Sequence, residues 1–393
     1  MVASAMFDDI RPYNDDEVRP TVERLLADRE LLAAVTQLRF PRAAKPLGWL
    51  LRPMVSRYLR RQSAGVNTVL DFQRKVIKDY LARTIDNTTS RVTTSGLEQL
   101  DANGAYLFVS NHRDIAMDPA LVNWTIYQAG FHTLRIAIGD NLLTKPYVSD
   151  LMRLNKSFVV NRSAKAPREK LRAAKQLSAY IHHSITQDRA NIWIAQREGR
   201  AKDGVDKTNS AVVGMLTLNR AKNESFTDYL HQLNIVPVSI SYQWDPCDAA
   251  KARELYQQRF GGGYQKAQHE DVQSIAMGIA GQKGHVHVAF GEPLQGDYAD
   301  NDAVTAELDR QIAANYVLHS SNCFAWQMLR GHPPKVRYSD QHLPFEPDEL
   351  ADEHAQFRQR IAALPQEHRR IALEMYANPV DAKLFENSHD AAQ

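Results

Sequence analysis

The residues best suited to chemistry lie in the segment Ser110-Asn-His-Arg-Asp-Ile-Ala-Met-Asp118. His112 follows Ala105–Val109, an apolar run with the length of a buried strand. A carboxylate within reach of an imidazole can hold one tautomer and stabilise the charged ring, so that the other nitrogen accepts a proton. We therefore expect His112 to act as a general base with Asp118 as its partner. In the alternative, Asp118 only caps the next helix and His112 is a polar loop residue.

The elements on either side of this segment determine where it would lie. Asp118 and Pro119 are residue types favoured at the N-cap and at the first helical position, so the sequence predicts a helix from Pro119. His112 would then occupy a loop at the carboxyl end of a strand. Open α/β sheets place their functional groups at that edge.

Further strands and helices alternate along the middle of the chain. Apolar runs predict strands at 105–110, 134–139, 158–160, 191–195, 235–242 and 285–290, and helical periodicity predicts helices at 147–154, 168–186 and 211–221. This alternation is typical of an α/β domain with a mainly parallel central sheet flanked by helices.

Helical periodicity predicts helices in the segments at both ends of the chain. Helices are expected at 18–38 and 66–82, and then at 304–316, 322–329 and 347–375, while the polar segment 87–96 is a break that can include an edge strand. We therefore predict a helical N-terminal extension over 1–90, a core over 91–300 and a helical C-terminal extension over 301–393.

Composition narrows the class of protein. The 393 residues are 44% hydrophobic and 24% charged, with a net charge of +2. The two cysteines, Cys247 and Cys323, are too few and too far apart for a disulfide framework, which fits a reducing cytosol. No window has the ~18–20 unbroken apolar residues of a membrane-spanning helix. We expect a cytoplasmic protein, soluble or peripheral on the cytoplasmic face of the membrane, with no nucleic-acid partner.

The segment Leu31–Leu70 contains no acidic residue. It has seven cationic residues, interleaved with aromatic and aliphatic ones: Arg39, Arg42, Lys45, Arg52, Arg57, Arg60 and Arg61. Such a stretch can lie on an anionic lipid surface. In the alternative it docks on its own domain with its arginines solvated.

Five sequence blocks, in order, resemble those of the glycerolipid acyltransferase family. The first is Asn-His followed by an Asp, here Asn111-His112 with Asp118-Pro119-Ala120. The others resemble the family's later strand-end motifs: Phe158-Val-Val-Asn-Arg162, Trp193-Ile-Ala-Gln-Arg-Glu-Gly-Arg200, Ile235-Val-Pro-Val-Ser-Ile-Ser-Tyr242 and Phe290-Gly-Glu-Pro293. Each block alone is unspecific, but five in the family's order are specific.

The resemblance implies a glycerol-3-phosphate acyltransferase-like fold and a transfer reaction. An acyl group would move from acyl-CoA or acyl carrier protein (acyl-ACP), as co-substrate, to a hydroxyl of glycerol 3-phosphate or 1-acylglycerol 3-phosphate. It implies His112 and Asp118 as the catalytic pair, with no other cofactor and no metal. Two alternatives remain: a lipid-binding protein of this fold without turnover, and acylation of a lysolipid that lacks phosphate.

The spacing departs from the family pattern in one respect. Five residues separate His112 from Asp118, where the family has four. A bulge in the loop could absorb the extra residue. Otherwise Asp114 could orient His112 and leave Asp118 as a cap, or the pair could be broken and the protein inactive. We favour Asp118, because Pro-Ala follows it as in the family.

A phosphate-bearing acceptor needs fixed cations and close backbone approach. Candidates at successive strand ends are Arg162, Arg197, Glu198, Gly199 and Arg200, with Lys202 and Lys207 behind them. Arginine has the planar fork that suits phosphate oxygens, and glycine allows a sharp turn close to a ligand. We expect Glu198 to hold the loop in shape, and Asp203 and Asp206 could neutralise the two lysines.

His285 and His287 alternate on the last predicted strand and could in principle bind a metal. No third ligand stands out beside them, which favours structural roles for both.

Overall fold

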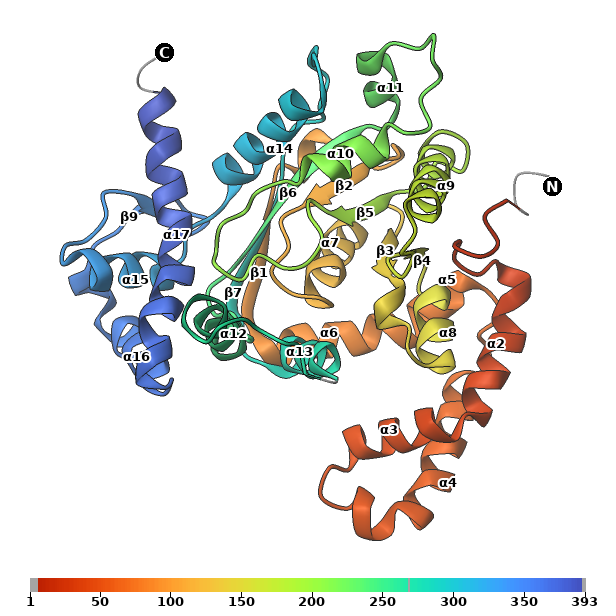
Figure 1. Cartoon of the computed structure of the whole chain (residues 1–393). Coiled ribbons are helices and arrows are strands. Elements are labelled where there is room, and N and C mark those ends of the chain that lie inside the picture. The colour runs from red at the N-terminus through yellow and green to blue at the C-terminus, as the bar shows by residue number, and fades with distance from the viewer. Residues whose placement is uncertain (1–5, 268, 391–393) are drawn as a thin grey trace. The chain divides into compact units, whose positions relative to one another are not determined.

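The computed structural model describes residues 6–267 and 269–390, and the chain divides into two units. The smaller unit comprises Met1–Arg83 and Arg135–Gln176, and the larger comprises Thr84–Leu134 and Leu177–Gln393. Figure 1 labels the helices and strands of both units. The units divide the chain differently from the three segments expected from sequence, because part of the predicted core groups with the N-terminal helices.

The fold is α/β with a mainly parallel sheet of seven strands, as predicted. In the larger unit, five strands follow the order β1-β7-β6-β2-β5, and their bounds are β1 Thr89–Ser95, β2 Leu107–Ser110, β5 Ile192–Ala195, β6 Ile235–Tyr242 and β7 Gly284–Phe290. Strand β2 runs parallel to both β5 and β6, whereas β7 is antiparallel to β6. The predicted edge strand is β1, which pairs with β7 alone in this unit.

Burial explains why the central strands are continuous apolar runs. All residues of β2 and β6 are buried, as expected where helices cover both faces of a parallel sheet. Ser110, the last residue of β2, pairs with Ala195 at the end of β5 and with Val238 in β6. The ends of β2 and β5 therefore lie level, and the loops that follow them leave the same edge of the sheet.

The helices of the larger unit have these bounds: α7 Met117–Gln128, α10 Ser210–Leu216, α11 Phe226–Gln232, α12 Asp248–Phe260, α13 Glu270–Ala280, α14 Asn301–Asn315, α15 Ser320–Arg330, α16 Ala351–Ala362 and α17 Gln366–Asp390. Helix α7 packs against β7 and α14 packs against β6. A short ribbon, β8 (Arg337–Tyr338) and β9 (Leu343–Pro344), precedes α16.

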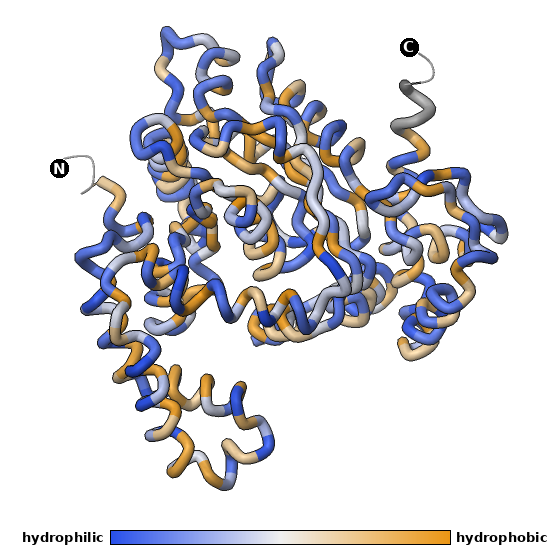
Figure 2. Tube along the Cα trace, turned by 180° about the vertical axis from the view of Figure 1, so that it is seen from behind, coloured by the Kyte–Doolittle hydropathy of each residue, from blue (hydrophilic) through white to orange (hydrophobic). Residues whose placement is uncertain are grey.

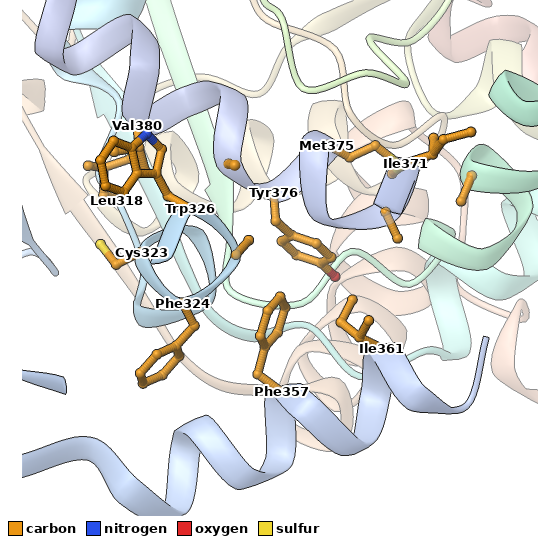
Figure 3. Close-up of a cluster of buried hydrophobic side chains, with 14 of the residues drawn as sticks. Leu318, Cys323, Phe324, Trp326, Phe357, Ile361, Ile371, Met375, Tyr376 and Val380 are labelled. Atoms are coloured by element: carbon orange, nitrogen blue, oxygen red, sulfur yellow. The ribbon is translucent and has the colours of Figure 1, made fainter. Parts of the chain in front are cut away.

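The C-terminal segment is helical, as predicted, and has an apolar core of its own. Helices α15, α16 and α17 surround an apolar cluster that includes Phe324, Phe357 and Tyr376, and the Phe357 and Tyr376 rings face each other in Figure 3. The Phe357 and Tyr376 rings meet edge to face, with their centroids 5.3 Å apart. Burial of this cluster stabilises the end of the chain against α12, which contributes Ala252.

The smaller unit contains the N-terminal helices and a parallel pair of strands. Its elements are α2 Asp15–Ala27, α3 Arg29–Arg39, α4 Ala44–Gln62, α5 Val69–Phe72, β3 Arg135–Gly139, α8 Pro146–Leu154 and β4 Ser157–Val160, with β3 parallel to β4. Helices α6 (Lys78–Thr88) and α9 (Pro167–Thr186) each contain residues of both units. A cluster that includes Val18, Val22 and Leu154 forms the core of this unit.

Three predicted helices are interrupted, and the one expected at 347–375 is divided into α16 and α17. The helix expected at 18–38 is divided at Asp28, whose carboxylate accepts a hydrogen bond from the Leu31 N–H and caps α3. The helix expected at 66–82 begins at Val69, passes through a π-helical turn at Gln73–Ile77 and continues as α6. Side-chain caps at Asp28 and Thr68 decide where α3 and α5 begin.

Within residues 6–267 and 269–390, no helix is sufficiently long and apolar to span a bilayer. Cys247 and Cys323 are both free and buried.

Candidate active site

The loop after β2 is anchored to β6 by Asn111. Its side-chain amide donates to the Ile240 carbonyl at 3.0 Å, and its Oδ1 accepts from the Ile240 N–H at 2.8 Å. The same amide also donates to Asp206 Oδ2 at 2.9 Å. Because Asn111 mimics a strand residue in this way, the next residue, His112, leaves the sheet in a defined direction.

His112 contacts Asp118 and not Asp114. The distance from His112 Nδ1 to Asp118 Oδ2 is 2.9 Å, and the Asp118 side chain is fully buried. The same oxygen accepts the backbone N–H groups of Arg113 at 2.6 Å and Asp114 at 2.9 Å. The loop therefore curls around the carboxylate, and the five intervening residues leave the two side chains in hydrogen-bond contact.

Asp114 has the capping role that the sequence suggested for Asp118. Its Oδ1 accepts the N–H groups of Ala116 at 2.9 Å and Met117 at 2.8 Å, and α7 begins at Met117. The predicted start at Pro119 is thus wrong by two residues, and Asp118 lies in the first turn of α7. The cause is local, because a carboxylate at 114 satisfies the first free N–H groups of the helix.

Asp114 is also packed tightly against α13. A Cβ on Gly278 would lie 2.1 Å from Asp114 Oδ2, so any side chain at 278 would displace that carboxylate. Burial, followed by the charge of Asp118, raises the pKa of Asp114. Helix α13 therefore supports the loop that carries His112.

The imidazole of His112 is fixed through Nδ1 and by its contact with Trp193, whereas Nε2 is not hydrogen-bonded within the described chain. Its ring meets the edge of Trp193 in β5, with 5.8 Å between centroids, and the Trp193 indole donates to Ser110 Oγ at 3.0 Å. In the described part of the chain, Nε2 of His112 makes no hydrogen bond, and 13% of the side chain is exposed. Nε2 is thus the nitrogen that can accept a proton from a bound hydroxyl.

A layer of buried charge lies behind this loop. The Arg113 guanidinium pairs with Asp206 at 2.6 Å and lies over the Tyr316 ring at 5.5 Å. Lys251 pairs with Asp245 and donates to the Arg113 carbonyl at 2.8 Å. Burial alone would raise the pKa of Asp245, but Lys251, the Cys247 N–H and Arg200 together lower it. These pairs hold the backbone on both sides of His112.

Sequence reasoning missed most of this supporting layer. Tyr242 donates from its hydroxyl to Asp118 Oδ1 at 2.7 Å, whereas the sequence pattern places it only at the end of the Val-Pro-Val strand. Lys251 and Asp245 belong to no recognisable sequence motif. The position of Tyr242 at the end of a buried strand was the one available signal, because such positions face the same edge as His112.

Among the predicted anion-binding residues, Arg200 is joined most directly to the His112 loop. Its Nη2 donates to Ser274 Oγ in α13 at 3.2 Å, whereas Nη1 is buried without a hydrogen-bond partner. The neighbouring Ala201 N–H donates to the His112 carbonyl at 2.8 Å. A buried guanidinium nitrogen without a partner, one residue from this contact, can bind an anion.

The other residues of this loop are less enclosed. Arg197 is half-buried, whereas Glu198 and Gly199 are exposed. Gly199 has φ of +75°, a left-handed conformation that favours glycine, and this agrees with the sharp turn expected there.

The remaining predicted cations lie in different surroundings. Lys202 pairs with Glu254 rather than with Asp203, Lys207 is exposed, and Asp206 pairs with Arg113. Arg162 follows β4 in the smaller unit, where its backbone N–H donates to Asp140 Oδ1 at 3.1 Å.

His285 and His287 lie on β7, where both contact the hydroxyl of Thr93 on β1. No cluster of three or more potential metal ligands occurs in the described residues.

Residues 91–241 match the family described as Acyltransferase. Among solved structures, the chain is similar to the 1-acyl-sn-glycerophosphate (LPA) acyltransferase PlsC from Thermotoga maritima, with 16% identity and a TM-score of 0.36, over 72% of this chain and 95% of that one. A search of curated proteins found no match.

The matched segment contains the loop after β2, the His112–Asp118 pair and Arg200. Residues 91–241 of this chain therefore match a family of the kind that the order of the sequence blocks predicted.

Proposed function

We propose that the protein transfers a fatty acyl group from acyl-CoA or acyl-ACP to a hydroxyl of glycerol 3-phosphate or 1-acylglycerol 3-phosphate. One observation carries the proposal: His112 Nδ1 lies 2.9 Å from the buried carboxylate of Asp118, while Nε2 stays uncommitted at the sheet edge. The family match over residues 91–241 supports acyl transfer, and the five sequence blocks support a glycerol-phosphate acceptor.

The reaction needs one base and no covalent enzyme intermediate. Nε2 of His112 removes the proton of the acceptor hydroxyl as its oxygen attacks the thioester carbonyl, and Asp118 stabilises the imidazolium. Collapse of the tetrahedral intermediate breaks the C–S bond, and His112 returns the proton to the departing thiolate. The cysteines have no part in it: both are buried, and burial raises the pKa of Cys247 to about 11.

Arg200 is the residue we propose for the acceptor phosphate. Its partnerless Nη1 and its planar fork suit a phosphate oxygen, and its backbone adjoins the His112 loop. Arg200→Ala should raise the acceptor KM more than it lowers kcat. Arg310→Ala, which removes an exposed guanidinium paired with Glu307, is the matched control and should change neither constant.

The test is thiol release from a long-chain acyl-CoA and from acyl-ACP. Each donor is offered with glycerol 3-phosphate and then with 1-acylglycerol 3-phosphate, using wild type and His112→Ala. Release that needs an acceptor and is lost in the variant supports the proposal and names the substrate pair. Release with only a non-phosphate lysolipid would identify the alternative acceptor. If no donor–acceptor pair releases thiol but the lipids bind, the result would favour a lipid-binding protein without turnover.

We also propose that helices α3 and α4 bind the surface of an anionic membrane, on its cytoplasmic face. Large apolar side chains are exposed there, among them Trp49 at 76% and Leu38 at 70%. On α4, Leu47, Leu50, Met54 and Tyr58 recur at helical spacing and are all exposed. Figure 2 shows hydrophobic and hydrophilic positions alternating along the segment of α3 and α4.

The charge of the helix pair indicates which surface it fits. Between Leu31 and Leu70 every charged residue is cationic, which complements anionic lipid head groups. Trp49 suits the interface of a bilayer, because its ring is apolar and its N–H is polar. Such a surface would bring the enzyme to lipid acceptors and products.

Sedimentation with vesicles tests this surface. Wild type should bind vesicles that contain phosphatidylglycerol and bind phosphatidylcholine vesicles far less. Trp49→Ala and Arg60→Ala/Arg61→Ala should each weaken binding, whereas Phe260→Ala, which removes an equally exposed aromatic ring from α12, should not. Equal binding of wild type to both vesicle types would contradict an electrostatic docking surface.

A further inference from the structure

Tyr242 contacts the carboxylate of Asp118 on the side away from His112. It is the last residue of β6, and its hydroxyl lies 2.7 Å from Asp118 Oδ1. Only 6% of Tyr242 is exposed, and Asp118 is fully buried. The contact joins residues 124 positions apart, and it exists because the last residues of β6 run beside the loop that follows β2.

The two oxygens of Asp118 are supported unequally. Oδ2 meets three donors, which are His112 Nδ1 and the N–H groups of Arg113 and Asp114. Oδ1 has Tyr242 as its single donor in the described part of the chain. A buried carboxylate oxygen without a donor is costly, so the plane of the carboxylate depends on this hydroxyl.

The phenol is the donor in this pair. Burial, followed by the charge of Asp118, holds the pKa of Tyr242 well above its usual value. The group therefore keeps its proton and can direct it only at Oδ1.

We infer that Tyr242 is a positioning residue: it fixes the plane of the Asp118 carboxylate and thereby the orientation of the His112 imidazole. The inference rests on the proposed acyl transfer. Tyr242 acts through Asp118, since its hydroxyl is bonded to that carboxylate and its side chain is buried.

Other charged groups surround the pair and stay in place when the hydroxyl is removed. Asp114 lies on the same loop and Asp245 follows β6, and both face Tyr242. Lys251 on α12 and Lys283 after α13 lie behind them, paired with Asp245 and bonded to Thr88 respectively. A change in pH dependence in a Tyr242 variant can therefore be assigned to the lost donor.

The test is Tyr242→Phe, which removes one oxygen and keeps the ring. Loss of a hydrogen bond to a charged group should lower kcat by about 10- to 100-fold, with the acceptor KM unchanged. The rise of kcat/KM with pH should move to higher pH, because a carboxylate that loses a donor holds a proton more readily. A merely structural role would lower stability without moving the pH profile.

A double-mutant cycle tests the route through Asp118. In an Asp118→Asn background, Tyr242→Phe should cause little further loss, since both changes remove the same support. A full and independent loss in that background would overturn the inference, as would an unchanged kcat in the single variant. Tyr13→Phe is the matched control: it removes a hydroxyl bonded to Asp150 at 2.6 Å in the smaller unit, and should leave kcat and the pH profile as in wild type.

A readout without substrate separates this inference from the proposed function. The NMR titration of the His112 imidazole, assigned with His112→Ala, should move to higher pH in Tyr242→Phe and not in Tyr13→Phe. That shift in a protein without transferase activity would overturn only the proposed function. An unchanged titration in an active enzyme would overturn only the role of Tyr242.

Discussion

His112 and the pair of buried histidines His285 and His287, all in the larger unit, have opposite surroundings. His112 shares one nitrogen with the carboxylate of Asp118 and leaves the other uncommitted. His285 and His287, between β1 and β7, have both nitrogens occupied, and His285 lies 3.4 Å from the Arg91 guanidinium and 4.0 Å from the Asp340 carboxylate. The difference shows what separates an imidazole that can work as a base from one that is structural.

The contacts of His285 and His287 determine their protons. Arg91 can only donate, so Nδ1 of His285 accepts, at 3.4 Å, and Nε2 carries the proton toward Thr93 Oγ1 at 2.6 Å. The Thr93 hydroxyl then donates to His287 Nδ1 at 2.8 Å, and His287 Nε2 donates to Ser95 Oγ at 2.9 Å. With both rings neutral, these hydrogen bonds all run in one direction.

The pKa values agree with this arrangement. Burial, then Arg91, lowers the pKa of His285 to about 4, and burial, then His285, lowers that of His287 to about 4. An added proton would place a donor where Arg91 or Thr93 already donates. These rings therefore bind β1 to β7 and cannot act as bases near neutral pH.

The comparison predicts its largest effect at His112. His112→Ala should lower kcat/KM by about 10²- to 10⁴-fold, the usual contribution of a general base. The melting temperature should change little, because the ring makes a single side-chain hydrogen bond in the described chain. Acyl-transfer kinetics and thermal unfolding are measured together, and activity within a few-fold of wild type would contradict the mechanism.

Asp118→Asn should have the second-largest effect on activity. An amide can present its NH₂ group to Nδ1 and favour the wrong tautomer, so we expect kcat to fall by about 10²-fold or more with the acceptor KM little changed. Asp101→Asn, at an exposed loop carboxylate that accepts the Asn103 N–H, is the control and should keep wild-type kinetics. An equal loss of kcat in the two variants would contradict a specific role of Asp118 in the reaction.

His287→Ala should affect stability and not chemistry. It removes a buried ring and leaves the half-buried Thr93 hydroxyl without its acceptor, which should destabilise the fold by about 1–3 kcal/mol. Urea unfolding measures this loss, and kcat per folded molecule should stay at the wild-type value. A selective fall in kcat would mean that His285 and His287 also serve the reaction.

The smallest effect concerns pH. His285 and His287 are neutral in the folded protein down to pH about 4, whereas the unfolded chain binds their protons below about 6.5. The unfolded state thus binds more protons in this range, and the free energy of unfolding should fall between about pH 6.5 and 4. Urea unfolding at pH 7 and pH 5 measures it, and the slope should be shallower in His287→Ala. An equal slope in both proteins would show that other groups cause it.

Sequence reasoning located the strands, most helices and the segment around His112. Apolar runs with the length of buried strands need only local pattern, and they predicted β2, β5 and β6 close to their observed bounds. The predicted helix boundaries were wrong where a nearby carboxylate caps the helix, as Asp28 does for α3 and Asp114 for α7. Sequence reasoning also failed for Tyr242, Lys251 and Asp245, which belong to no motif and reach the loop only through the fold.

The sequence by itself determined that a histidine would stand at the end of a buried strand with aspartates two and six positions later, because that depends on local order alone. Only the tertiary structure decided between Asp114 and Asp118. The choice depends on α13, where Gly278 admits the Asp114 carboxylate, and on β6, where Tyr242 meets Asp118. Likewise, alternation put His285 and His287 on one face of a strand, but Arg91 and Thr93, more than 190 positions earlier, decided their protonation. Contacts between distant segments set the charge state of a buried group, and no local pattern contains them.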